Sequence, residues 1–250
     1  MEIEIYGASH IGCVRELNED SFCTYGFENG EPSGFCILSD GMGGHNAGEV
    51  ASQKTVQFMA EGLMTVLAAP DECVIPKVLK ESVKTTNEKI FRMSQDNCNQ
   101  RGMGATLVAA VFEKETVYIA NVGDSRAYAI RNSEIKQITK DHSVVEEMVA
   151  CGSITKEEAR NHPQRNVITR AMGTDPNTKA DIFEYNYMDG DKLLICSDGL
   201  SSLVADDEIL RIVSQGKNAE ETVKALIEKA NDCGGYDNIT VIYAEFIQEG

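Results

Sequence analysis

No part of this 250-residue chain approaches the roughly 18 consecutive apolar residues that a membrane-spanning helix needs. No basic segment near the N-terminus leads into an apolar one, as it does in a secretory signal peptide. The sequence therefore predicts a cytoplasmic protein without a membrane anchor. We expect one domain over residues 1–250, because a single hydrophobic core can serve a chain of about this length.

Cysteine and histidine are present but lack the spacing of metal ligands. The eight cysteines never form a Cys-x-x-Cys pair, and several lie inside apolar runs, as small buried hydrophobic residues do. The four histidines have no obvious nucleophile as a partner. These absences argue against zinc, against disulfides and against covalent catalysis.

Positive charge is scarce. The chain has 23 basic against 40 acidic residues, a formal charge of −17. Such a charge repels nucleic acid and anionic lipid, so we expect neither as a partner, whereas cations suit it. An acidic surface that only aids solubility explains the total charge equally well.

The common phosphate-binding and nucleophile motifs are also missing. A dinucleotide loop needs Gly-x-Gly-x-x-Gly, but the sixth position counted from Gly41 is Asn46, and the chain has no Gly-Lys-Ser/Thr of a P-loop. It has no Gly-x-Ser-x-Gly nucleophile elbow either. Any phosphate chemistry must therefore use another design.

Hydrophobic periodicity predicts strands and helices that come in groups. Strands are expected at 34–39, 105–112, 116–122, 126–130, 192–196 and 239–246, and helices at 47–68, 74–97, 206–215 and 218–232. Asn46, Asp206 and Asn218 are candidate helix caps. The polar stretch 141–180, with a Thr155-x-x-Glu158 capping box, predicts one or two short helices and a loop. Without βαβ alternation, the fold class is α+β with antiparallel sheets covered by helices.

Five aspartates occur at the ends of expected strands or in turns beside them. Asp40 and Asp198 each follow an apolar strand within a Ser-Asp-Gly sequence; Asp237 precedes one, Asp124 lies in a hairpin turn, and Asp20 lies beside an apolar patch. Any one of them is most simply a turn residue. Several unpaired carboxylates in one cleft would repel each other, and divalent cations resolve that conflict.

Oxygen ligands without histidine or cysteine select hard ions such as Mg²⁺ or Mn²⁺. Gly41 is a candidate neutral ligand, since its carbonyl can approach a metal closely. Two such ions about 3.5 to 4 Å apart, bridged by a carboxylate and a water, activate that water for attack on phosphorus. The pattern is typical of a hydrolase.

Two further side chains are candidates for the same chemistry. Arg15 is near Asp20 in sequence, and its guanidinium can grip phosphate oxygens, although an ordinary surface ion pair is the alternative. His45 is a possible general acid that protonates the leaving oxygen, or simply a residue at a helix start.

With these residues laid out, the chain resembles the metal-dependent protein serine/threonine phosphatases of the PPM (PP2C-like) family, in particular the bacterial branch. The segments that carry the resemblance, almost end to end, are Val14-Arg-Glu-Leu-Asn-Glu-Asp-Ser21, Ser39-Asp-Gly-Met-Gly-Gly-His45 with Gly48-Glu49, Met103-Gly-Ala-Thr106, Val122-Gly-Asp-Ser-Arg126, Asp141-His-Ser143, Cys196-Ser-Asp-Gly-Leu200 and Gly234-Gly-Tyr-Asp-Asn-Ile-Thr240.

The resemblance implies two antiparallel β-sheets sandwiched between layers of α-helices, with two Mn²⁺ or Mg²⁺ ions at one end. By this resemblance Asp40 bridges both ions, Asp198 and Asp237 complete one, the Gly41 carbonyl binds the other, and Asp20 supports the site through metal-bound water.

The resemblance also implies that Arg15 grips the substrate phosphate and that Asp124, with Asp198, holds a weaker third ion. Residues 143–180 match the family's mobile flap. Met42 stands where the eukaryotic branch has a histidine after Asp-Gly, and His45 is not a matched replacement.

The expected function is hydrolysis of phosphoserine and phosphothreonine in proteins by direct attack of a metal-bridging hydroxide. We expect a monomer that opposes a bacterial Ser/Thr kinase, and the kinase itself is an expected substrate. The alternatives are a catalytically silent module that binds phosphoproteins and a hydrolase of small phosphate esters.

Overall fold

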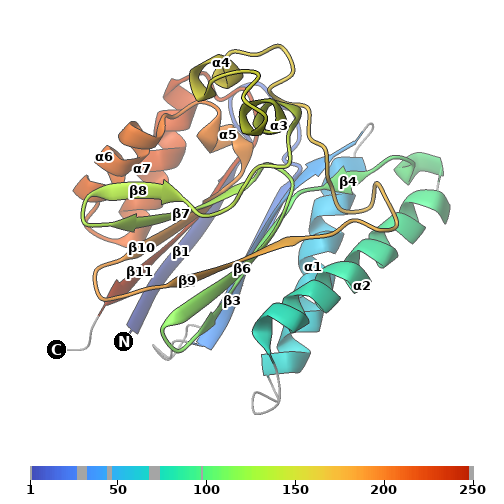
Figure 1. Cartoon of the computed structure of the whole chain (residues 1–250), viewed down its shortest axis with the longest axis horizontal. Coiled ribbons are helices and arrows are strands. Elements are labelled where there is room, and N and C mark those ends of the chain that lie inside the picture. The colour runs from blue at the N-terminus through green and yellow to red at the C-terminus, as the bar shows by residue number, and fades with distance from the viewer. Residues whose placement is uncertain (1, 27–32, 44–46, 68–73, 97, 248–250) are drawn as a thin grey trace.

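The structure is a computed structural model that describes residues 2–26, 33–43, 47–67, 74–96 and 98–247. Two antiparallel sheets lie face to face, and helices cover the outer side of each (Figure 1). The predicted α+β class, with two antiparallel β-sheets between layers of α-helices, is confirmed.

The first sheet has the strand order β1-β11-β10-β7-β8, and every neighbouring pair is antiparallel. Its strands are β1 (Glu2–His10), β7 (Arg126–Arg131), β8 (Glu134–Gln137), β10 (Lys192–Cys196) and β11 (Ile239–Ile247).

The second sheet has the order β2-β3-β5-β6-β9, and the short β4 pairs with β3. Its strands are β2 (Asp20–Tyr25), β3 (Ser33–Met42), β4 (Gly104–Ala105), β5 (Leu107–Glu113), β6 (Thr116–Val122) and β9 (Asp181–Asn186).

The central strands are apolar on both faces because both faces are covered. In β3, Cys36 and Leu38 join the core between the two sheets, whereas Phe35 and Ile37 join the core under the helices. Since successive side chains of a strand point to opposite faces, an unbroken apolar run is what such a position requires. This explains why β3 could be recognised in the sequence.

Each outer face carries a pair of helices. Helices α1 (Ala47–Leu67) and α2 (Ile75–Asp96) pack on the second sheet, and α6 (Asp206–Gln215) and α7 (Ala219–Asp232) pack on the first (Figure 1). A one-turn helix, α5 (Asp198–Ser201), follows β10 directly. None of the helices within the described residues is long and apolar enough to cross a bilayer.

The helix caps agree with the sequence in part. The side chain of Asn218 accepts a hydrogen bond from the Glu221 amide at the start of α7, as predicted. At α6 the cap residue is Ala205, and Asp206 lies in the first turn, so the predicted Asp206 cap is wrong. Asn46 lies outside the described residues.

Between β8 and β9 the chain forms α3 (Val144–Ala150) and α4 (Lys156–Arg160) and then runs without regular structure to β9. The predicted capping box is present, because Thr155 accepts from the Glu158 amide and Glu158 from the Thr155 amide. Both helices lie above the end of the sandwich where α5 begins (Figure 1).

Candidate metal centre

In the second sheet, two acidic residues face each other across paired strands. Asp20 begins β2, Asp40 is near the end of β3, and the two are direct partners in the antiparallel register. The backbone of Asp40 is fixed by Thr106, whose hydroxyl accepts from the Asp40 amide at 2.9 Å and whose own amide donates to the Asp40 carbonyl at 2.8 Å. The strand end that carries Asp40 is therefore held rigidly.

In the first sheet, Asp198 follows β10 and Asp237 precedes β11, so the pairing of these strands brings both to the same end of the sheet. The two sheets are joined at that end by Asp20. One oxygen of its buried carboxyl group, Oδ2, accepts from the hydroxyls of Ser197 at 2.8 Å and Thr240 at 2.6 Å. Strands of both sheets thus meet around a common group of carboxylates.

Asp124 lies in the turn between β6 and β7. Its neighbour Gly123 has a φ of +103°, and its amide donates to Nδ1 of the buried His142 at 3.1 Å. On the other side, the Ser125 hydroxyl bonds to the Thr106 hydroxyl at 2.7 Å. The turn that presents Asp124 is therefore tied to the residue that holds Asp40.

Burial and mutual repulsion raise the pKa values of these carboxyl groups. The pKa of Asp20 is raised to about 7 and that of Asp198 to about 6, in both cases first by burial and then by neighbouring carboxylates. Burial and the charges of Asp198 and Asp141 raise the pKa of Asp124 to about 8.

For Asp40, burial and four neighbouring carboxylates hold the pKa well above its usual value. The neighbours, in order of effect, are Asp20, Asp198, Asp124 and Asp237. Four carboxylates therefore lie close enough to Asp40 to oppose its ionisation.

The donor atoms fit a hard divalent cation. Asp20 Oδ1 and Asp198 Oδ1 are buried and have no hydrogen-bond partner among the described residues. A buried oxygen without a partner is costly, and a cation would satisfy it. Yet no three Asp, Glu, His or Cys side chains in the described part of the chain meet closely enough to form a complete ligand set.

Arg15 already neutralises one of these carboxylates. Its Nη2 atom lies 2.6 Å from Oδ2 of Asp237, and both side chains are partly exposed. Burial lowers the pKa of the Arg15 guanidinium, but the bond to Asp237 and the charges of Asp237, Glu19 and Asp40 outweigh it and raise the pKa. The Arg15 guanidinium thus lies within the electric field of these carboxylates.

The loop that carries Arg15 is held by Asn238, which is 4% exposed. Its Nδ2 donates to the carbonyls of Ile11 at 2.9 Å and Leu17 at 3.0 Å, and its Oδ1 accepts from the Glu19 amide at 2.8 Å. One side chain therefore fixes residues 11–19 beside Asp237, its own neighbour in sequence.

Gly41 is required by packing. A Cβ atom there would lie 2.1 Å from the Gly48 carbonyl oxygen and 2.7 Å from that of Glu19. Its amide donates to the Glu19 carbonyl at 3.0 Å. The amides of Gly48 and Glu49, at the start of α1, donate to the Glu19 carboxylate. The backbone after Asp40 is therefore packed directly against α1 and the loop before β2.

A sequence profile described as "Protein phosphatase 2C" matches residues 6–232 of the chain. The serine/threonine phosphatase stp of Listeria welshimeri is 39% identical over 234 residues, which are 94% of this chain and 92% of that protein. The chain belongs to the protein phosphatase 2C family.

Solved phosphatase 2C structures are similar in fold. The crystal structure of the Mycobacterium tuberculosis serine/threonine phosphatase PstP/Ppp superposes with a TM-score of 0.88 at 35% identity and covers 99% of this chain and 100% of that one. The PstP catalytic domain in complex with two manganese ions gives a TM-score of 0.84 at 34% identity, covering 99% of each chain. Metal dependence follows from membership of the family.

In this phosphatase 2C chain, the predicted acidic residues lie together. Asp20, Asp40, Asp198 and Asp237 are at one end of the sandwich, and Asp124 is near enough to raise the pKa of Asp40. Arg15 contacts Asp237, although Asp20 is much nearer to it in the sequence. His45, the possible general acid, lies outside the described residues.

Sequence reasoning did not identify the polar side chains that support the aspartates. Thr106, Ser197, Asn238 and Thr240 are all buried and hydrogen-bonded to the strands or carboxyl groups of the site. Each lies in a segment that carries the family resemblance. Buried polar residues within a strand-end motif are the signal that could have found them.

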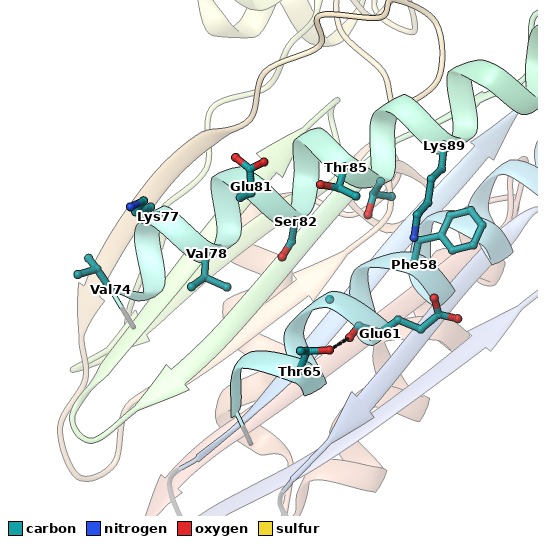
Figure 2. A pocket seen from close by; sticks show the side chains of 12 residues that line it. Phe58, Glu61, Thr65, Val74, Lys77, Val78, Glu81, Ser82, Thr85 and Lys89 are labelled. Atoms are coloured by element: carbon teal, nitrogen blue, oxygen red, sulfur yellow. Dashed lines mark hydrogen bonds between the residues drawn. The ribbon is translucent and has the colours of Figure 1, made fainter. Parts of the chain in front are cut away.

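Two pockets differ in their relation to these residues. One of about 520 Å³ includes Asp124 and Asp198 and extends beneath α3 and α4. Another, of about 580 Å³, lies between α1 and α2, where Val74 and Val78 line it and Lys89 stands over the ring of Phe58 (Figure 2). The carboxylates adjoin the first pocket, so the larger pocket, between α1 and α2, is not the candidate metal centre.

Replacing Asn238 by alanine is expected to lower the free energy of unfolding by about 2–4 kcal/mol, because three partly buried backbone groups lose their partner. Urea denaturation measures the change. The matched control is Asn218→Ala at the cap of α7, which should cost about 1 kcal/mol. A loss at Asn238 no greater than that at Asn218 would contradict the role given to this side chain.

Proposed function

We propose that this phosphatase 2C chain removes phosphate from phosphoserine and phosphothreonine in proteins and depends on Mn²⁺ or Mg²⁺. The proposal rests on four aspartates at one end of the sandwich: Asp20, Asp40, Asp198 and Asp237. Two of them, Asp20 and Asp198, each have a buried oxygen without a hydrogen-bond partner among the described residues, and the guanidinium of Arg15 contacts Asp237. The names of the relatives, which are serine/threonine phosphatases, support the substrate class.

In this proposal Asp40 would hold both ions, because it is the carboxylate that its neighbours face. Asp198 and Asp237 would complete one ion and the Gly41 carbonyl the other, while Asp20 would support the site through bound water. Asp124, with Asp198, would hold a weaker third ion. When bound, such ions neutralise the carboxylates and activate water for attack on phosphorus.

The chain's own residues supply position and charge. The guanidinium of Arg15 would bind the phosphate oxygens of the substrate, since its planar fork matches them. It is held near the carboxylates by the Asn238 contacts, so a phosphate bound to it is placed at the edge of the cluster. The hydrogen bonds from Ser197 and Thr240 keep Asp20 oriented.

Arg15→Ala is expected to raise KM for a phosphopeptide by roughly 10- to 150-fold, the equivalent of about 1.5–3 kcal/mol for a lost charge-assisted contact. The effect on kcat should be smaller, because the variant keeps every candidate metal ligand. Initial rates over a range of peptide concentrations separate the two constants. An unchanged KM would show that Arg15 does not grip the phosphate.

We also propose that the chain acts as a monomer and opposes a bacterial Ser/Thr kinase, which is itself among the substrates. The bacterial serine/threonine phosphatases that match nearly the whole chain support this setting. Size-exclusion chromatography with light scattering tests the first point. Phosphate release from an autophosphorylated kinase domain tests the second.

The decisive experiment measures phosphate release from a phosphothreonine peptide, from nucleotides and from a small aryl phosphate, with Mn²⁺ and then with EDTA. We expect Mn²⁺-dependent release that is fastest from the peptide and absent with EDTA. Peptide binding without release would favour the silent binding module. Release mainly from nucleotides or the aryl ester would favour the small-ester hydrolase.

A further inference from the structure

Two large hydrophobic side chains are exposed beside the Arg15–Asp237 pair. Val14, directly before Arg15, is 59% exposed, and Tyr236, directly before Asp237, is 65% exposed. Single exposed hydrophobic residues are common, but here one adjoins each half of the same ion pair. We call Val14 and Tyr236 the apolar rim.

The two segments that carry the rim run side by side. The Cys13 amide donates to the Gly235 carbonyl at 2.7 Å, and Arg15 reaches Asp237 at 2.6 Å. Val14 and Tyr236 are the middle residues of the two segments joined at these points. Since consecutive Cα atoms are about 3.8 Å apart, each rim residue lies one short step from the ion pair.

The ring of Tyr236 is seated on the backbone rather than projecting freely. A Cβ atom added to Gly234, whose φ is +119°, would lie 2.6 Å from Cζ and 2.7 Å from Cε2 of that ring. Only glycine leaves room for the ring in this place. The ring therefore has one supported face and a large exposed area, and an ordered aromatic side chain binds with little loss of entropy.

We propose that the apolar rim binds an apolar or aromatic side chain that lies two positions from the phosphorylated residue of the substrate. The inference rests on the proposed function, because it takes the phosphate to be held at Arg15. In an extended peptide, side chains two positions apart lie on the same face, about 6.6 Å from each other, so a phosphate at Arg15 brings the side chains two positions before and after it toward Val14 and Tyr236. The rim thus favours hydrophobic over polar residues at these two positions.

Met188 is an exposed hydrophobic residue in a different position. Met188 is 57% exposed, but it lies between β9 and the start of β10, whereas Asp198 follows the end of β10. It is thus separated from the carboxylates by the length of a strand. This makes Met188 a matched control: it has similar exposure and hydrophobic character, and it lies at the opposite end of the sheet.

The test uses two phosphothreonine peptides that differ only at the positions two residues before and two residues after the phosphothreonine, with leucine in one and serine in the other. The measured quantity is the ratio of their kcat/KM values with Mn²⁺, which does not depend on the fraction of active enzyme. We expect a preference of about 5- to 20-fold for leucine, as contact with one apolar side chain typically gives. Tyr236→Ser and Val14→Ser should each reduce the preference, and the double variant should bring it within about 2-fold of unity, whereas Met188→Ser should retain it.

Equal rates for the two peptides in the unaltered protein would overturn the proposal, and so would an undiminished preference in the double variant. The ratio of the two dissociation constants, measured by fluorescence anisotropy with labelled peptides, gives a second reading that needs no turnover. If no peptide releases phosphate, the proposed function fails, yet the binding ratio still decides whether the rim prefers leucine.

Discussion

Asp40→Asn is expected to lower the Mn²⁺-dependent rate of phosphate release by at least about 10³-fold, or ~4 kcal/mol of transition-state stabilisation. Asparagine keeps the shape of the side chain but loses the charge that the neighbouring carboxylates face. An amide can offer one oxygen to a cation, so it cannot replace a bridging carboxylate. Rates with and without Mn²⁺, compared with the unaltered protein, measure the loss.

The same variant should lose no stability in the absence of metal, although it loses activity. Without metal, the Asp40 carboxyl group resists ionisation because it is buried among like charges, so removing it relieves repulsion. The melting temperature of metal-free Asp40→Asn at pH 8 should be equal to or above that of the unaltered protein. The rise in melting temperature on adding Mn²⁺ should be largely lost, since that rise reports binding to the folded state.

Asp207→Asn is the matched control for Asp40→Asn, because Asp207 is an exposed aspartate in the first turn of α6. It should keep its rate within about 2-fold and change stability by less than about 1 kcal/mol, the usual contribution of a charge at a helix start. If Asp40→Asn keeps a full rate, Asp40 is not the central ligand, and the proposed assignment is wrong.

The fold was predictable where a strand or helix is covered by the core. β3, β5, β6, β7, β10 and β11 lie at or near the positions that the sequence indicates, because their apolar runs are buried on both faces. β1 and β2 are not predicted, since polar residues such as Glu4 and Thr24 interrupt the unbroken apolar run that marks the other strands. The alternation of residues 2–5 is the signal that could have found β1. β1 pairs with β11, which is distant in the chain, whereas β2 pairs with β3, the next strand along the chain. Local sequence carries little information about a partner as distant as β11.

The site was predictable as a set of aspartates but not as a geometry. The repeated Ser-Asp-Gly after two strands indicates Asp40 and Asp198, and the structure places them in sheets that only tertiary packing brings together. The hydrogen bonds of Asp20 to Ser197 and Thr240, which join these sheets, span 177 and 220 residues. The partner of Arg15 was equally hidden, because Asp237 lies 222 residues away.

The metal-free protein is expected to lose stability as the pH rises from 6.5 to 8.5. The folded-state pKa values of Asp20 and Asp124, about 7 and about 8, lie well above the value of 3.8 in an unfolded chain. Between pH 3.8 and these raised values, the folded protein binds more protons than the unfolded chain, so the free energy of unfolding falls as the pH rises. The stabilisation that each protonated carboxyl group contributes is lost as the pH passes the folded-state pKa of that group. The expected fall is on the order of 3 kcal/mol, which corresponds to roughly 6–12 °C in melting temperature for a chain of this size.

The pH window is chosen to separate these carboxyl groups from His142, whose pKa is lowered by burial and by the charge of Arg170, although its bond to Asp181 opposes this. A histidine with a lowered pKa destabilises the fold only as pH falls below about 6.5, which is the opposite slope. Differential scanning fluorimetry in EDTA across this pH window gives the slope of melting temperature against pH. Asp124→Asn should flatten that slope, because the variant lacks one of the carboxyl groups with a raised pKa.

Saturating Mn²⁺ should reverse the trend. Metal ligands must be deprotonated, so the affinity for Mn²⁺ falls as the pH falls, because protons compete for Asp20, Asp124 and Asp198. The melting curves with and without Mn²⁺ should therefore diverge as the pH rises, with the largest gap at 8.5. Parallel curves, or a metal-free protein more stable at pH 8.5 than at 6.5, would mean that these carboxyl groups do not share one cation-binding cleft. The same charges that make the metal-free fold weaker at high pH are thus the ones that give it affinity for a metal.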